Sequence, residues 1–470
     1  MPDFISESSS YKDPDSRVFY YGDQVFRYIE PGHYPFYAGL LRNPLILQLM
    51  AAGELVGTEE AELEENCPAV KIYGTRRFFR HERIVNISYP YEWPFSMFRD
   101  AALFTLKLQK RLIGQDLSLK DATPFNIQYR GTKPVFIDYG SFEPISDNGV
   151  WFALNQFMQM FFYPLALKTF HGIDVKSLLL TQPEGISFAE TYRLLGWKAK
   201  LRWELLPHFL LPRLFAVGSR KGKRKDTAAA KVKLNPRNNQ SVQTFMVNRM
   251  VKLISKLKGY KNVSDWSDYT ESKSYSAEAD AFKKALTADF FNNHRGLSVL
   301  DLGANTGEFS LLAAQAGCAV TAVEYDQESI ERLYLSAKEG NFNILPLWVD
   351  IANPTPGIGW NNRERSSFVE RYQADCVLAL ALAHHLLITR RQPLEQIAEL
   401  FADLTKKFLL VEYIGRADAM FQELILNRRE SYGYFNLDYF KEIFQRSFRI
   451  VREEKVPQMD RVVFVMEKLC

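Results

Sequence analysis

A glycine-rich turn and two later acidic residues have the types and spacing of a nucleoside-binding site. The turn reads Asp-Leu-Gly-Ala-Asn-Thr-Gly over 301–307, and Glu324 and Asp350 follow it. Gly303 and Gly307 allow the backbone to turn tightly and to approach a ligand where a Cβ would obstruct it. A carboxylate at Glu324 can accept hydrogen bonds from both hydroxyls of a ribose. One at Asp350 can accept a hydrogen bond from an adenine amino group.

The spacing of this turn separates it from dinucleotide sites. It is D-x-G-x-x-x-G and not G-x-G-x-x-G, so a pyrophosphate-binding loop is the weaker interpretation. The apolar Ile351, next to Asp350, would pack on the adenine ring. A lone glycine-rich turn is often only a turn, and a lone acid after a strand is often a helix cap. The order of all three features along the chain is what indicates a ligand site.

These residues fall within a region where short apolar runs alternate with amphipathic segments. The alternation predicts a parallel sheet with helices on both faces, a doubly wound α/β domain. In such domains ligands bind at the carboxyl ends of the strands. We expect strands at 298–302, 319–324, 344–350, 375–380 and 408–413 and helices at 308–316 and 327–337. Two runs in the tail, 448–452 and 461–467, predict a closing antiparallel pair.

Stretches 299–310 and 375–386 resemble motifs of class I S-adenosylmethionine-dependent methyltransferases. Stretches 350–360, 266–269 and 274–276 are similar to a narrower set that includes the nodulation protein NoeA. The resemblance covers nearly the whole chain. It implies a Rossmann-like C-terminal domain, S-adenosyl-L-methionine as the cofactor, and in-line transfer of a methyl group to an unidentified small molecule or glycan.

The resemblance also implies a role for each residue of the site. Asp301 would contact the methionine ammonium group directly or through water, and Glu324 would hold the ribose. Asn305 stands where many methyltransferases have a glycine. The residues that would bind the cofactor are Asp301, Gly303, Asn305, Thr306, Gly307, Glu324, Asp350, Ile351 and Leu380.

Three residues are candidates for the methyl-transfer step. If the acceptor is a hydroxyl, a general base assists, and histidine suits neutral pH. His384 and His385 follow the fourth predicted strand, although a histidine pair there also caps or packs against the next helix. Glu412 ends the fifth strand and is open to two interpretations, acceptor binding or a buried structural hydrogen bond. Tyr269 and Tyr275 would either cover the cofactor as a lid or pack on helices.

The N-terminal half carries a second pattern. Asp121 and Asn126 are spaced like the base and the metal-binding Asn of a kinase catalytic loop, and Asp138-Tyr-Gly follows an apolar run where kinases place a metal-binding Asp. The preceding His and the glycine-rich loop are missing, and Lys71 is the only candidate for the phosphate-binding lysine. We therefore expect a degenerate kinase-like α+β domain that acts as a scaffold or selects the acceptor. The alternatives are a phosphotransferase with an S-adenosylmethionine-sensing C-terminal domain and a non-catalytic binding protein.

Length, composition and charge bear on the domain organisation, the partners and the location of the protein. The 470 residues predict an N-terminal domain at 1–217, a basic linker at 218–240 and a methyltransferase domain at 241–470. A net charge of +4 does not indicate a nucleic-acid partner, and four scattered cysteines suit a reducing cytoplasm. The apolar run 205–217 beside the linker raises peripheral membrane contact, but docking on its own domain is favoured. The apolar run 150–167 predicts a buried helix. The dispersed acids and histidines do not indicate a metal site.

Overall fold

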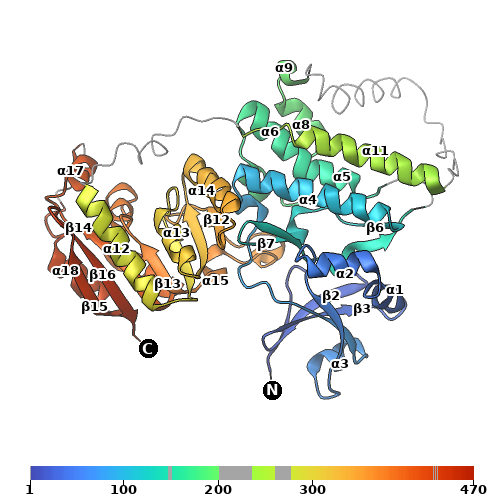
Figure 1. The fold of residues 1–470 in the computed structure, drawn as a ribbon, viewed down its shortest axis with the longest axis horizontal. Helices are drawn as coiled ribbons and strands as arrows, with labels where there is room; N and C mark the ends of the chain where they lie inside the picture. Colours follow the sequence, from blue (N-terminus) through green and yellow to red (C-terminus); the bar gives the residue numbers. More distant parts are fainter. Residues whose placement is uncertain are drawn as a thin grey trace.

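A computed structural model describes residues 2–146, 151–200, 236–259, 277–426, 428, 430 and 432–469. The chain forms an N-terminal α+β part and a C-terminal α/β part that lie side by side (Figure 1). Residues 201–217 and most of the predicted linker lie outside the described residues, as do Tyr269 and Tyr275. Within the described ranges, no helix is both long enough and apolar enough to cross a membrane.

The described C-terminal part is built on one seven-stranded sheet of order β12-β11-β10-β13-β14-β16-β15. The first five of these strands run parallel, and β16 runs antiparallel to both β14 and β15. The predicted doubly wound sheet and its closing antiparallel pair are therefore confirmed. The strands are β10 (Ser298–Leu302), β11 (Ala319–Glu324), β12 (Ile344–Trp348), β13 (Ala374–Ala379), β14 (Thr405–Ile414), β15 (Phe448–Lys455) and β16 (Arg461–Lys468).

Side chains that alternate along these strands enter separate cores on the two faces of the sheet. Val299 belongs to one apolar cluster and Leu300 to the other, as the period of two along a strand requires. Both faces are covered, which explains why these strands read as continuous apolar runs. The helices of this part are α12 (Ala277–Asn293), α13 (Glu308–Gln315), α14 (Gln327–Glu339), α15 (Phe368–Arg371), α16 (Leu394–Leu404), α17 (Ala419–Ile425) and α18 (Leu437–Phe444). The short turns are η5 (Trp360–Asn362) and η6 (His385–Thr389).

The N-terminal part begins with a five-stranded antiparallel sheet of order β1-β2-β3-β5-β4. Its strands are β1 (Phe4–Ser6), β2 (Ser16–Tyr21), β3 (Gln24–Ile29), β4 (Thr58–Glu62) and β5 (Arg77–His81), with helices α1 (Tyr34–Leu40), α2 (Pro44–Ala51) and α3 (Pro68–Tyr73). Two small antiparallel pairs follow, β6 (Leu117–Leu119) with β9 (Phe142–Pro144) and β7 (Ile127–Arg130) with β8 (Lys133–Phe136).

Helices make up the rest of the N-terminal part. They are α4 (Phe95–Ile113), α5 (Leu154–Phe157), α6 (Tyr163–His171), α7 (Val175–Thr181), α8 (Phe188–Leu194), α9 (Trp197–Lys200) and α11 (Pro236–Ile254). Short turns lie at η1 (Pro90–Glu92), η2 (Pro124–Asn126) and η3 (Tyr139–Ser141), and η4 (Met158–Phe162) is a π-helical turn between α5 and α6. Phe157, Phe161 and Leu165 are buried, so the helix predicted within 150–167 is confirmed.

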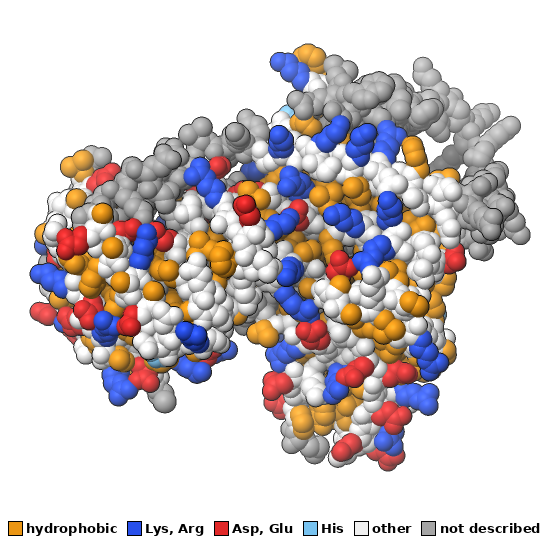
Figure 2. Space-filling view, viewed as in Figure 1, with side chains coloured by type: hydrophobic (Ala, Val, Ile, Leu, Met, Phe, Trp, Pro, Cys, Tyr) orange, Lys and Arg blue, Asp and Glu red, His pale blue; other side chains and the backbone are white. Residues whose placement is uncertain are grey.

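Helix α11 packs against α4, so it belongs by its contacts to the N-terminal part (Figure 1). Its buried face carries Val247, Met250 and Ile254. Its first residues, 236–240, fall within the predicted linker. Residues 241–254, which the sequence analysis assigned to the methyltransferase domain, thus pack on a helix that lies more than a hundred residues earlier in the sequence. Figure 2 shows Lys and Arg side chains gathered over α4 and α11.

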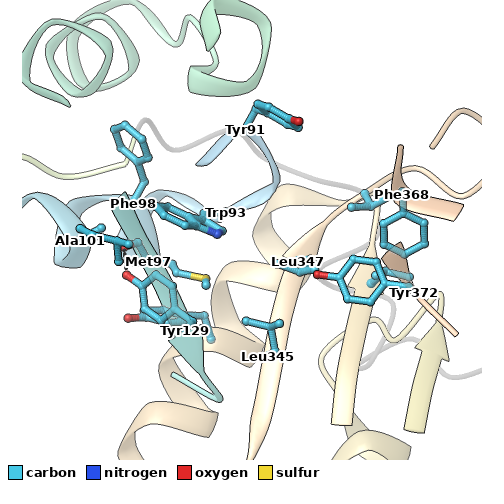
Figure 3. Close-up of a cluster of buried hydrophobic side chains, with 14 of the residues drawn as sticks. Tyr91, Trp93, Met97, Phe98, Ala101, Tyr129, Leu345, Leu347, Phe368 and Tyr372 are labelled. Carbon is cyan, nitrogen blue, oxygen red and sulfur yellow. Dashed lines mark hydrogen bonds between the residues drawn. The ribbon is translucent and has the colours of Figure 1, made fainter. Parts of the chain in front are cut away.

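The two parts share one apolar core. Trp93 and Tyr129 from the N-terminal part and Leu347 and Tyr372 from the C-terminal part belong to the same buried cluster (Figure 3). Strand β7 lies against the edge strand β12, and a Cβ on Gly131 would come within 3.2 Å of the Phe342 carbonyl oxygen. The N-terminal part therefore closes one edge of the C-terminal sheet.

A buried ion pair crosses this interface. Arg371 on α15 pairs with Glu92, and the two side chains are 7% and 0% exposed. Arg371 also donates to the Ile87 carbonyl, and Thr355 donates to Glu92. Both charges are thus satisfied by a partner from the opposite part of the chain.

Replacing Arg371 with Met is expected to lower the free energy of unfolding by about 3–5 kcal/mol, because Glu92 is left charged and buried. Urea denaturation followed by circular dichroism measures this. The control is Arg449→Met, which breaks the exposed Arg449–Glu467 pair, whose side chains are 69% and 40% exposed, and should cost less than about 1 kcal/mol. Equal losses in the two variants would contradict a buried interface pair.

Candidate active site

A cavity of about 250 Å³ opens at the carboxyl ends of the parallel strands. It receives residues from the ends of β10, β11, β12 and β13, from α12 and from the start of η6. Eight of the nine cofactor residues predicted from the sequence line it: Asp301, Gly303, Asn305, Thr306, Glu324, Asp350, Ile351 and Leu380. Both predicted histidines, His384 and His385, line it too. Gly307 and Glu412 are not among its lining residues.

The glycine-rich turn crosses from β10 to α13. The N–H groups of Gly303 and Ala304 both donate to the Val323 carbonyl, at 2.9 and 3.0 Å, which ties the turn to β11. Gly307 caps α13 with a φ of 87°, and a Cβ there would lie 2.2 Å from Leu333 Cδ1. Glycine at 307 is therefore required by the packing of α13 against α14. Its role is to shape the turn from behind the cavity.

Glu324 presents a fixed carboxylate to the cavity. It accepts hydrogen bonds from the N–H groups of Asn305, Tyr325 and Asp326 at 2.8–2.9 Å. Only 6% of the residue is exposed, and burial raises its pKa. The three donors hold the carboxylate in one orientation, as a bidentate contact with a ribose requires.

Asp301 lies beside Glu324, on the neighbouring strand. It accepts a 2.6 Å hydrogen bond from Ser310 Oγ and is 4% exposed. Burial, and to a smaller extent the charge of Glu324, raise the pKa of its carboxyl to about 6, although the hydrogen bond from Ser310 opposes this shift. Asp301 is thus ionised at neutral pH but close to its titration range.

The predicted adenine end carries a cation that the sequence analysis did not anticipate. Arg390 Nη2 forms an ion pair with Asp350 Oδ2 at 2.7 Å, and its guanidinium lies 5.8 Å from the ring centroid of Tyr325. Asp350 also accepts from the Ala352 N–H at 3.0 Å. A carboxylate has about four acceptor positions, so Asp350 can hold Arg390 and still receive an amino group.

The two predicted histidines also line the cavity. Their ring centroids are 4.1 Å apart. His384 is 2% exposed, and its Nδ1 has no hydrogen-bond partner. Burial, and then the charges of His385, Arg461 and Lys283, hold the pKa of His384 well below its usual value. Burial and Arg461 lower the pKa of His385 to about 4. Both rings are therefore neutral at pH 7 and can accept a hydrogen bond.

Glu412 lies behind the cavity, at 0% exposure. Its carboxylate is 3.2 Å from Lys283 Nζ and 3.6 Å from Arg461 Nη1. Arg461 also forms a two-point pair with Asp418 at 2.6 and 2.8 Å. Of the two sequence interpretations of Glu412, this geometry favours the structural one, in which it holds buried cations in place.

Three residues on the histidine side were missed by the sequence analysis: Asp280, Lys283 and Met420. Lys283 lies between the buried Ala279 and Leu286 on α12, at spacings of four and three. A lysine within the apolar stripe of a helix was the signal that could have found it.

The residues of the kinase-like pattern in the N-terminal half, Asp121, Asn126 and Asp138, lie close together. Asn126 Nδ2 donates to Asp138 Oδ2 at 3.2 Å. Burial raises the pKa of Asp121, and the charge of Asp138 raises it further. Asp138 Oδ1 is paired at 2.8 Å with Arg27 from β3, a residue the sequence analysis did not single out. Lys71 is exposed on α3 and does not lie on a strand, as a phosphate-binding lysine would. Within the described ranges, no cluster of three or more His, Cys, Asp or Glu could hold a metal ion.

Comparison with known proteins is consistent with this site. Residues 275–448 match a family model described as a methyltransferase domain. The chain is 29% identical over 465 residues to nodulation protein NoeA of Rhizobium meliloti strain 1021, covering 98% of this chain and 96% of NoeA.

Among solved structures, magnesium protoporphyrin IX methyltransferase ChlM of Synechocystis PCC 6803 is 16% identical, with a TM-score of 0.29, covering 45% of this chain and 87% of ChlM. The structure of WbdD is 17% identical, with a TM-score of 0.30 and 46% of each chain covered.

The family match spans strands β10 to β14 and the cavity at their carboxyl ends. Residues 275–448 match a methyltransferase domain, and the chain is a methyltransferase.

Proposed function

We propose that the chain transfers the methyl group of S-adenosylmethionine in line to a small molecule or glycan whose accepting group lies beside His384. One observation carries the proposal: a single cavity joins the strand-end carboxylates of Asp301, Glu324 and Asp350 to two neutral histidines. A methyltransferase needs these two halves, one for the cofactor and one for the acceptor.

The residues of the cofactor half fit S-adenosylmethionine. Glu324 would accept the two ribose hydroxyls, and Asp301 would face the methionine ammonium group. Asp350 would accept the adenine amino group, with Ile351 on the ring. Asn305 lines the same cavity, and its buried Oδ1 has no hydrogen-bond partner, so a donor of the cofactor would satisfy it.

The bound cofactor supplies a methyl group made electrophilic by its sulfonium. The protein then has to align a nucleophile and exclude water, and alignment of this kind accounts for at most about 7–11 kcal/mol of a reaction barrier. The neutral His384 can accept a hydrogen bond from a hydroxyl or amino acceptor and so orient its lone pair toward the methyl group, and the proton lost on methylation leaves to solvent. Lys283 and Arg461 keep that histidine neutral, and Glu412 holds both cations.

For the N-terminal domain we propose a degenerate kinase-like scaffold that selects the acceptor. Arg27 already neutralises Asp138, the residue that a phosphotransferase would use to hold a metal ion. Phosphotransfer is therefore the weaker candidate. Calorimetric titration with Mg-ATP tests whether the chain is a phosphotransferase. ATP binding by the wild type that is lost in Asp138→Ala would make phosphotransfer the favoured function of the N-terminal domain.

Replacing Glu324 with Gln is expected to weaken S-adenosylhomocysteine binding roughly 10- to 100-fold, because hydrogen bonds to a charged group contribute about 1.5–3 kcal/mol. Isothermal titration calorimetry measures the affinity. Glu328→Gln, on the exposed face of α14, is the matched control and should bind like the wild type. Unchanged affinity in Glu324→Gln would remove the ribose assignment.

Lowering the pH is expected to weaken S-adenosylhomocysteine binding. Protonation of Asp301, whose pKa is about 6, removes the charge that faces the cofactor ammonium group. The dissociation constant should rise by up to about tenfold per pH unit below 6, the equivalent of 1.4 kcal/mol. Calorimetry at pH 5 to 8 checks this, and the dependence should be shallower in Asp301→Asn. A wild-type affinity that is flat across this range would contradict the assigned role.

The acceptor class is tested by incubating the enzyme with methyl-tritiated S-adenosylmethionine and a cell extract separated into small-molecule, glycan, protein and nucleic-acid fractions. Label is expected in one of the first two fractions and should be reduced with Glu324→Gln. His384→Ala, which removes the group that orients the acceptor, should lower kcat about 10²-fold, with S-adenosylhomocysteine affinity within about threefold of wild type. Label confined to protein or nucleic acid would contradict the acceptor class. If His384→Ala instead lowers only the affinity for S-adenosylhomocysteine, His384 belongs to the cofactor site and not to the acceptor site.

A further inference from the structure

We propose that the N-terminal domain sets the affinity for the adenosine half of the cofactor, with Lys176 and Asp174 acting as positioning residues across the interface. The proposal rests on the assignment of Glu324 and Asp350 to the cofactor. It adds that the methyltransferase domain does not build this half of its site alone.

Lys176 on α7 reaches the end of β12. Its Nζ donates to the Trp348 carbonyl at 3.1 Å and lies 5.0 Å from the centroid of the Trp348 ring. Burial lowers the pKa of Lys176, although the charges of Glu92, Asp350 and Asp174 oppose this shift. One lysine thus holds both the backbone and the indole of the residue at which β12 ends, two positions before Asp350.

Trp348 connects the end of β12 to the residues at the end of β11. Its indole Nε1 donates to the Tyr325 carbonyl at 2.7 Å, and the next N–H, that of Val349, donates to the Glu324 carbonyl at 3.0 Å. Tyr325 is the residue whose own N–H binds the Glu324 carboxylate. Lys176 therefore supports, through one side chain, the loop that orients the proposed ribose ligand.

Gln327, at the far end of the same loop, also contacts the N-terminal domain. Gln327, the first residue of α14, donates from Nε2 to Asp174 Oδ1 at 2.7 Å and accepts at Oε1 from Lys168 Nζ at 2.7 Å. Lys168 is 5% exposed and is paired with Asp174. Both partners of Gln327 come from the N-terminal domain, so Gln327 is held directly from outside its own domain, while Tyr325 is held through Trp348.

Fixing a ligand loop before the ligand arrives improves affinity, because less conformational entropy is lost on binding. Loops at the ends of strands are otherwise the least constrained part of a doubly wound domain. The interdomain contacts thus explain how Glu324 and its three backbone donors keep one geometry.

The test compares two interface lysines in the full chain. Lys176→Met removes one interdomain hydrogen bond and one cation–ring contact beside the cavity. The matched control is Lys338→Met, because Lys338 pairs with Asp100 and lies 5.8 Å from the ring of Tyr334 at the other end of α14, away from the cavity lining. The dissociation constant for S-adenosylhomocysteine should rise roughly 3- to 10-fold in Lys176→Met and stay within about twofold of wild type in Lys338→Met.

Kinetics separate positioning from general loosening. KM for S-adenosylmethionine should rise in Lys176→Met with kcat retained, and Lys176→Arg should recover part of the affinity. Gln327→Ala removes the hydrogen bonds of Gln327 to Asp174 and Lys168. It should also weaken binding, and it replaces Lys176→Met in the test if that variant fails to fold. Equal losses in Lys176→Met and Lys338→Met, or wild-type affinity in Lys176→Met and Gln327→Ala, would overturn the inference. Absence of S-adenosylhomocysteine binding by the wild-type chain would instead overturn the cofactor assignment on which it rests.

Discussion

The edge of a parallel sheet has unpaired backbone groups and apolar faces that must be covered, and in this protein the N-terminal domain covers them at β12. Strand β7 lies against that edge, and the side chains of Leu345 and Leu347 enter a core shared with Trp93 and Tyr129. Much of the geometry described above depends on this packing. It buries the Arg371–Glu92 pair, and it brings α7 to the strand ends that build the adenosine half of the cavity.

Charge is distributed unevenly around the cavity, and the distribution separates its two halves. The proposed cofactor half has the carboxylates of Glu324, held by backbone N–H groups, and of Asp301, held by a serine hydroxyl. The proposed acceptor half has two histidines, kept neutral by burial and by buried cations. Buried charges need partners in order to persist, and Glu412 supplies one for both Lys283 and Arg461. Lys283 and Arg461, both held by Glu412, therefore help to keep His384 neutral.

Local patterns predicted the C-terminal sheet and the cofactor end of the site. Strand ends can be read from apolar periodicity, and topology then places Asp301, Glu324 and Asp350 at one edge. Contacts between distant parts of the chain could not be predicted in this way. Arg27 pairs with Asp138 from a separate strand, Lys283 enters the cavity from α12, and Lys176 approaches it from another domain. Apart from the place of Lys283 in the apolar stripe of α12, nothing local in the sequence marks these residues, because tertiary packing brings them to their partners.

Hydrogen–deuterium exchange of the full chain with and without S-adenosylhomocysteine tests most directly whether one site depends on both domains. The account predicts slower exchange at residues 303–307, 324–327 and 348–351, and also at 168–176 across the interface. Protection confined to the C-terminal domain would contradict the dependence on the N-terminal domain. No protection at the strand ends, despite measurable binding, would show that the ligand occupies another site.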